Sequence, residues 1–115
     1  MIYIIEDNEL MAECIADACK GHDHKIFHEA VSAISEMSDE NPDLIFLDVL
    51  LTGPDGFTFL NEIMSYEDSA KIPIVIVSSL DLSRLNLKSY GVVEVLNKDT
   101  MLPKDIKRLA DQYAK

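Results

Sequence analysis

The sequence is poor in basic residues and contains only two cysteines. Lysine and arginine total 10 against 21 acidic residues, which gives a formal net charge of -11 at pH 7. Because a polyanion would be repelled by such a chain, binding of nucleic acid is not expected. Cys14 and Cys19 are five positions apart in a predicted helix, where about 100° of turn per residue puts them on different sides. This spacing favours two reduced, partly buried thiols over a metal pair or a disulfide.

Long apolar runs and linker-like segments are also missing. The longest apolar stretch, 72–80, is interrupted by Pro73 and two serines, and it falls far short of the ~20 residues of a membrane-spanning helix. The chain passes from Met1 directly into apolar residues, without a basic region or a cleavage site. We therefore expect a cytoplasmic protein with no membrane association. Its 115 residues are expected to form one domain, 1–115, with no output domain.

What the sequence does contain is a series of short aliphatic segments. They occupy 2–5, 25–28, 44–47, 74–77 and 92–96. The first, third and fourth are continuous apolar runs rather than alternating ones, a pattern typical of parallel strands that are buried on both faces. The segments therefore predict a central parallel sheet.

Stretches with helical spacing lie between these strands. Asn8 is suited to cap the first helix, which should stop near Gly21. Further helices are expected over 30–37, over 57–64, as a short piece through Leu82, Leu85 and Leu87 that is closed by Gly91, and from Pro103 to Tyr113. The apolar face of the first helix is expected to comprise Leu10, Met11, Cys14, Ile15 and Ala18.

The alternation of strands and helices predicts an α/β fold. Right-handed crossovers give a flavodoxin-like (βα)5, doubly wound parallel sheet of five strands in the order 2-1-3-4-5, with helices on both faces. In such a sheet ligands bind at the carboxyl ends of the strands, near the topological switch point.

Polar residues follow four of the predicted strands. Glu6 and Asp7 follow the first, Asp48 the third, Ser78 the fourth and Lys98 the fifth. Three neighbouring carboxylates would raise one another's pKa unless a cation lay among them, and carboxylates with water are the ligands that Mg²⁺ accepts. The ammonium and hydroxyl groups could stabilise a transferring phosphoryl group while Asp48 attacks the phosphorus in line.

This pattern resembles the receiver domain of two-component response regulators, over essentially the whole chain. The acidic pair after the first strand matches, as do Asp48 with Gly56 eight residues later, Ser78 thirty residues after Asp48, and Lys98 after the last strand. Each motif alone is weak. Their order, on the expected strand ends, makes the resemblance specific.

The resemblance implies a phosphorelay function. Asp48 would accept a phosphoryl group from a phosphohistidine of a sensor histidine kinase or a histidine phosphotransfer protein, with the help of Lys98 and Ser78. The chain would catalyse only its own phosphorylation and dephosphorylation, and would signal to a protein target through the face of its fourth helix, fifth strand and fifth helix. The implied Mg²⁺ ligands are Asp7, Asp48, the backbone carbonyl of Leu50 and, mostly through water, Glu6.

Three positions depart from the family pattern. Val95 stands where an aromatic residue is common, Asp99 where a proline usually follows the lysine, and Thr52 where a proline is frequent. Without the aromatic residue, a signal would have to travel through Ser78 and the loop 79–83. A cis peptide bond before Asp99 is not expected, because outside proline that form costs ~2.5–4 kcal/mol.

Other functions fit the residues less well. A haloacid-dehalogenase-like phosphatase needs a second acid two residues after Asp48, where this chain has Leu50. A flavin- or nucleotide-binding protein needs a phosphate-binding loop after the first strand, and the acidic sequence 6–9 would repel a phosphate. The histidines of 22–28 lack zinc-type spacing. The remaining rival is a receiver-like module that binds partners without being phosphorylated.

Overall fold

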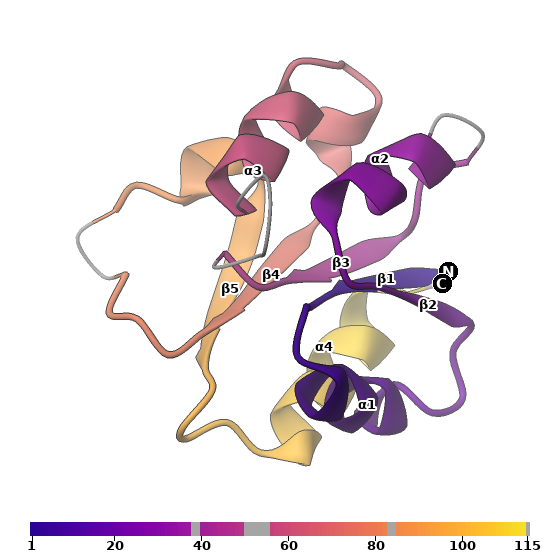
Figure 1. Ribbon diagram of the computed structural model, residues 1–115, viewed down its shortest axis with the longest axis vertical. Coiled ribbons are helices and arrows are strands. Elements are labelled where there is room, and N and C mark those ends of the chain that lie inside the picture. The colour runs from indigo at the N-terminus through magenta and orange to yellow at the C-terminus, as the bar shows by residue number, and fades with distance from the viewer. Residues whose placement is uncertain (38–39, 50–55, 83–84, 115) are drawn as a thin grey trace.

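A five-stranded parallel sheet forms the centre of the molecule (Figure 1). The computed structural model describes residues 1–37, 40–49, 56–82 and 85–114. The strand order is β2-β1-β3-β4-β5, so the fold class and order predicted from the sequence are confirmed. The strands are β1 (Ile2–Ile5), β2 (His24–Phe27), β3 (Leu44–Leu47), β4 (Ile74–Ser78) and β5 (Val92–Asn97).

Helices cover both faces of the sheet (Figure 1). α1 and α4 lie on one face and enclose a core that includes Ile15 and Leu109, while α2 and α3 lie on the other, over a core that includes Phe59. The three inner strands are buried along their whole length, as their continuous apolar runs predict. The helices are α1 (Glu9–Ala18), α2 (Ala30–Met37), α3 (Gly56–Met64) and α4 (Pro103–Tyr113), with 3₁₀ turns η1 (Ser69–Lys71) and η2 (Lys88–Tyr90).

The predicted short helix between β4 and β5 is wrong for the residues that the structure describes. Between 85 and 91 the helical element is the 3₁₀ turn η2, so α4 is the helix that the sequence predicts as the fifth. Leu82 and Leu87 are buried and Leu85 is exposed. Buried positions five apart do not share one face of an α-helix, which explains the misassignment. The predicted stop at Gly91 is confirmed, since this residue caps η2 with φ 80°.

The buried face of α1 also differs from the prediction. Leu10 and Cys14 point to solvent, whereas Ala12, Ile15 and Cys19 are buried. These three positions follow the i, i+3, i+7 spacing of one helical stripe. Both cysteines are free and lie on different sides, as predicted, but one is exposed and the other fully buried rather than both being partly buried. Burial raises the pKa of the Cys19 thiol to about 12.

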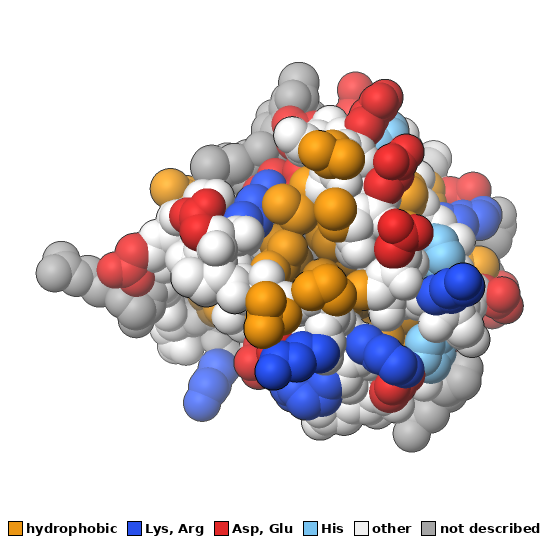
Figure 2. Space-filling model, turned by 90° about the horizontal axis from the view of Figure 1, so that it is seen from below, with side chains coloured by type: hydrophobic (Ala, Val, Ile, Leu, Met, Phe, Trp, Pro, Cys, Tyr) orange, Lys and Arg blue, Asp and Glu red, His pale blue; other side chains and the backbone are white. Residues whose placement is uncertain are grey.

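On the α1 and α4 side of the molecule most acidic and basic side chains are separated, although α4 also carries the exposed Asp111. Figure 2 shows apolar side chains between a group of acidic and a group of basic side chains. The exposed acids of α1 are Glu9, Glu13 and Asp17, and the exposed bases of α4 are Lys104, Lys107 and Arg108. In the described part of the chain, no helix combines the length and the hydropathy required to cross a bilayer.

Candidate functional site

The carboxylates predicted from the strand ends come together at the carboxyl edge of the sheet. β1 and β3 are paired in register up to Ile5 and Leu47, and the Asp48 N–H donates to the Ile5 carbonyl at 2.9 Å. These contacts place the residues after the two strands side by side. Carboxylate oxygens of Glu6, Asp7 and Asp48 all lie within 4.8 Å of one another.

Lys98 supplies a positive charge to this group. Its Nζ lies 2.7 Å from Glu6 Oε1 and 3.1 Å from Asp48 Oδ2. The Lys98 N–H donates to the Ser78 carbonyl at 3.0 Å, which continues the β4–β5 pairing past the end of β5. Burial lowers the pKa of the ammonium group, but its interactions with the Glu6 and Asp48 carboxylates outweigh this effect and the pKa is raised. Lys98 is therefore charged at neutral pH.

Glu6 is the most deeply buried acid of the site, with 1% of its surface exposed. Burial raises the pKa of this carboxyl to about 7, although Lys98 acts in the opposite direction. Its Oε2 accepts a hydrogen bond from the Asn8 N–H at 3.2 Å. Its Oε1 is buried and receives no hydrogen bond of good geometry from the described residues, so its 2.7 Å contact with Lys98 is an ion pair. A buried carboxylate oxygen of this kind retains capacity for a further donor.

The turn after β1 sets the start of α1. Asn8 Oδ1 accepts a hydrogen bond from the Met11 N–H at 2.9 Å, which confirms the predicted cap. The cap begins the helix directly after the acidic pair, of which Glu6 is buried and Asp7 is half-buried.

Ser78 is buried at the end of β4, next to the neighbouring strand residue Asn97. Its Oγ accepts a hydrogen bond from the Leu80 N–H at 3.1 Å. The Leu50 carbonyl, Thr52 and residue 83 of the predicted switch loop lie outside the described residues. Val95, at the position where the family commonly has an aromatic residue, is exposed on the edge strand.

The turn after Lys98 depends on a residue that the sequence reasoning missed. Asn97 Oδ1 accepts a hydrogen bond from the Asp99 N–H at 2.7 Å, and the Asn97 carbonyl accepts one from the Met101 N–H at 2.8 Å. This is an asparagine turn, a known tendency of this residue at the end of a strand. All described peptide bonds are trans, as expected with Asp99 in the place of proline.

The histidines make separate contacts with other parts of the described chain. His22 contacts Asp111 at 2.8 Å, and His24 contacts the His22 carbonyl at 3.0 Å. His28 Nδ1 lies 2.9 Å from the Glu6 carbonyl, a contact with the acidic turn that the sequence reasoning did not predict. Among the described residues, the group of possible metal ligands is the acidic one and contains no histidine.

The chain belongs to the response regulator receiver domain family, whose model matches residues 2–110. It is 31% identical over 105 residues to protein-glutamate methylesterase/protein-glutamine glutaminase 3 of Geobacter metallireducens, covering 84% of this chain and 29% of that protein. It is 33% identical over 103 residues to the transcriptional regulatory protein RstA of Escherichia coli, covering 86% and 42%. The chain thus spans less than half the length of these relatives.

Solved structures share the fold. The phosphorylated cyanobacterial phytochrome response regulator RcpA superposes with a TM-score of 0.83 at 24% identity, covering 97% of this chain and 91% of that one. The NtrX receiver domain from Brucella abortus gives 0.83 at 23% identity, covering 97% and 96%. The Mn²⁺-bound response regulator Rcp1 gives 0.72 at 23%, covering 96% and 88%. At these identities the likeness establishes the fold alone.

Family membership assigns the protein to two-component signalling. Receiver domains interact with histidine kinases or phosphotransfer proteins and bind Mg²⁺ through acidic residues. The acidic group of Glu6, Asp7 and Asp48 is compatible with such a metal site.

Proposed function

We propose that the protein accepts a phosphoryl group on Asp48 from a phosphohistidine of a sensor histidine kinase or a histidine phosphotransfer protein. The observation that carries this proposal is the grouping of three carboxylates within 4.8 Å, with the Lys98 ammonium bridging Glu6 and Asp48. Carboxylates grouped this closely repel one another unless a cation lies among them. Clusters of such titratable groups are typical of functional sites, and this one is suited to the transfer of a phosphoryl group.

The donor set fits Mg²⁺. Asp7 and Asp48 would bind the metal directly, with the Leu50 carbonyl as a further ligand, and Glu6 would accept from a metal-bound water. The buried Glu6 Oε1, which receives no hydrogen bond of good geometry from the described residues, supports this last role. Hard oxygen ligands and retained water are what this ion requires. When bound, Mg²⁺ offsets negative charge on the phosphoryl oxygens.

The chain's own residues account for the remaining steps. An Asp48 carboxylate oxygen attacks the phosphorus, the N–P bond of the phosphohistidine breaks, and its electron pair stays on the imidazole nitrogen. Lys98 is close enough to Asp48 to bind an oxygen of the transferred group. The Ser78 hydroxyl, now an acceptor for Leu80 N–H, would turn to donate to another phosphoryl oxygen. The only other reaction would be hydrolysis of the phosphorylated Asp48 by water, which restores the carboxylate and releases phosphate.

The signal would leave through the face formed by the segment before β5, β5 itself and α4. Exposed apolar side chains gather on this segment and strand, and apolar exposed surface is typical of interaction sites. We propose a cytoplasmic protein target for this face and no direct contact with nucleic acid, since the chain carries a net charge of -11. The exposed residues of this segment and strand are Leu80, Leu85, Val93 and Val95, and the exposed Leu102 directly precedes α4.

The experiment is amide NMR of the protein with Mg²⁺, before and after adding beryllofluoride, a mimic of the phosphoryl group. The Asp48→Asn variant is the control, because it keeps the size of the side chain and removes the nucleophilic carboxylate. We expect shifts that require both Mg²⁺ and Asp48 and that spread to β5 and α4.

A second candidate is a receiver-like module that acts without phosphorylation. The exposed aliphatic Val95 favours it, since the usual aromatic switch residue is absent. A folded protein that does not respond to Mg²⁺ and beryllofluoride would refute the phosphorylated switch and establish this alternative.

A further inference from the structure

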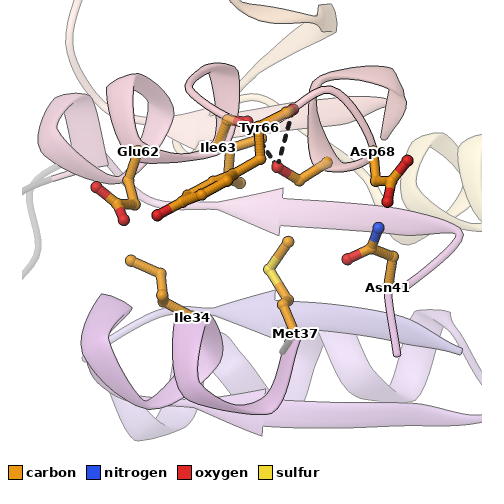
Figure 3. Close-up of a pocket in the computed structure, with 8 residues that line it drawn as sticks. Ile34, Met37, Asn41, Glu62, Ile63, Tyr66 and Asp68 are labelled. Atoms are coloured by element: carbon orange, nitrogen blue, oxygen red, sulfur yellow. Dashed lines mark hydrogen bonds between the residues drawn. The ribbon is translucent and has the colours of Figure 1, made fainter. Parts of the chain in front are cut away.

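A cavity of about 400 Å³ lies between α2 and the carboxyl-terminal end of α3 (Figure 3). It is bordered by Asn41, which precedes β3, and by Asp68, which precedes β4. The cavity is therefore at the amino edge of the sheet, whereas Asp48 and Ser78 are at the carboxyl edge. Neither the proposed phosphoryl chemistry nor the proposed output face uses it.

The middle of the cavity is apolar. Ile34 and Met37 of α2 face Ile63 and the ring of Tyr66 across it (Figure 3). Ser69 Oγ donates to the Ile63 carbonyl at 2.6 Å and lies 3.4 Å from the Tyr66 carbonyl. These bonds tie η1 to the backbone at the end of α3, from which the Tyr66 side chain extends. An aliphatic chain would bury its methylene groups here, against apolar and aromatic surface.

The two ends of the cavity are acidic. Glu62 lies at one end of the cavity, and Asp68 lies at the other end, next to the Asn41 amide (Figure 3). Within the described chain, neither carboxylate forms an ion pair with a lysine or arginine, although other acids do so. The cavity thus combines an apolar middle with a negative charge at each end.

We propose that this cavity binds a linear aliphatic diammonium ion. Its methylene chain would lie along Ile34, Met37 and Tyr66, and its two ammonium groups would pair with Glu62 and Asp68. The side-chain amide oxygen of Asn41 offers a second acceptor at the Asp68 end. The face of the Tyr66 ring attracts a neighbouring cation. The cavity volume falls in the range of pockets for small organic ligands, about 300–1,000 Å³. The proposal is independent of the proposed phosphorylation of Asp48.

The test is an amide NMR titration of the whole chain with 1,6-diaminohexane at physiological ionic strength. We expect saturable shifts confined to the end of α2, the end of α3 and η1. 1-Aminohexane, which has one ammonium group, should bind about three- to fivefold more weakly, as expected for one lost exposed ion pair. 1,6-Hexanediol, which has none, should bind more weakly still.

Variants separate this site from general attraction to an acidic protein. Glu62→Gln and Asp68→Asn should each weaken binding about threefold, whereas Glu67→Gln removes a neighbouring exposed charge that does not line the cavity and should change nothing. Asp48→Asn should also bind normally. Equal losses in Glu62→Gln and Glu67→Gln, equal binding of the monoamine, or binding of a basic peptide without binding of the diamine would overturn the proposal.

Discussion

Among single residues, Lys98 contributes most to the balance of charge, since it compensates two buried carboxylates. Replacing it by methionine leaves Glu6 and Asp48 without their cation. Breaking a buried ion pair costs ~3–5 kcal/mol, and the partial exposure of Lys98 reduces this. We expect Lys98→Met to lower the free energy of unfolding by about 2–3 kcal/mol at pH 8 without Mg²⁺, measured by urea denaturation.

The pH dependence and a surface pair provide controls for this prediction. The folded protein holds the Glu6 proton up to a pKa of about 7, against an ordinary value of 4.5. Between these values the folded chain binds more protons than the unfolded one, so stability falls as pH rises through this window. The deficit of Lys98→Met should therefore shrink towards pH 5. Lys25→Met, which breaks the exposed 3.2 Å pair with Glu36, should cost less than about 1 kcal/mol.

We expect Asn97 to position Lys98 through the backbone of the turn that follows it. Its side-chain oxygen accepts the Asp99 N–H at 2.7 Å and so fixes the backbone after Lys98. Asn97→Ala removes this acceptor and should weaken beryllofluoride binding about three- to tenfold, equivalent to the net value of one hydrogen bond. Asn97→Asp keeps the acceptor and should restore most of the affinity in the same NMR titration. Loss in both variants, or in neither, would contradict a positioning role.

Position in the sequence predicts which residues meet at the site, but not all the bonds that hold them. Glu6, Asp48 and Lys98 can be placed because parallel strands end at one edge of the sheet. The hydrogen bonds made by Asn97 and His28 cannot be predicted in this way. A side-chain hydrogen bond depends on a rotamer and on the shape of a turn, and the hydrophobic periodicity of a sequence encodes neither. Asn97, which directly follows the predicted strand 92–96, is nevertheless a sequence signal for a turn.

Among the elements, the connection between β4 and β5 departs most from the prediction. Gly91 ends η2 with φ 80°, and its carbonyl accepts the Ile74 N–H at 3.1 Å. An added Cβ would lie 3.4 Å from the Ile72 carbonyl oxygen, an ordinary contact, so the strain of a substitution comes from the backbone. Gly91→Ala should lower the free energy of unfolding by about 1–2 kcal/mol.

Asparagine at this position is the matched control, because it enters the left-handed region more readily than alanine. Gly91→Asn should cost about half as much as Gly91→Ala in the same urea denaturation. Similar losses for both substitutions would mean that the local packing, rather than φ, decides the effect.

The strands and the long helices followed from hydrophobic patterns, and the errors share one cause. The pattern predicts the position of α1 correctly, but it places Leu10 on the buried face of the helix, and this side chain is exposed. In 82–91 three leucines predict an α-helix, but Leu82 and Leu87 are buried by a described path that contains no α-helix, only the 3₁₀ turn η2. Apolar residues in short segments indicate burial, while the backbone that achieves it is set by tertiary packing.

For the whole molecule, the excess of 21 acidic over 10 basic residues gives a net charge of -11. Self-repulsion destabilises a chain of this charge, so any salt should raise the melting temperature by screening. A bound Mg²⁺ should add a specific effect, because a ligand at ten times its Kd contributes about 1.4 kcal/mol.

This specific effect can be separated from screening by matching ionic strength. For a domain of this size we expect saturating Mg²⁺ to raise the melting temperature about 4–6 °C more than NaCl of equal ionic strength. Asp7→Asn removes a proposed ligand and should abolish the difference between the two salts, while Asp17→Asn, an exposed acid on α1, should preserve it. Equal melting temperatures in the two salts for the unchanged protein would mean that the grouped carboxylates attract cations without binding one. In that case Lys98 would be their principal compensation, and the deficit of Lys98→Met should not respond to Mg²⁺.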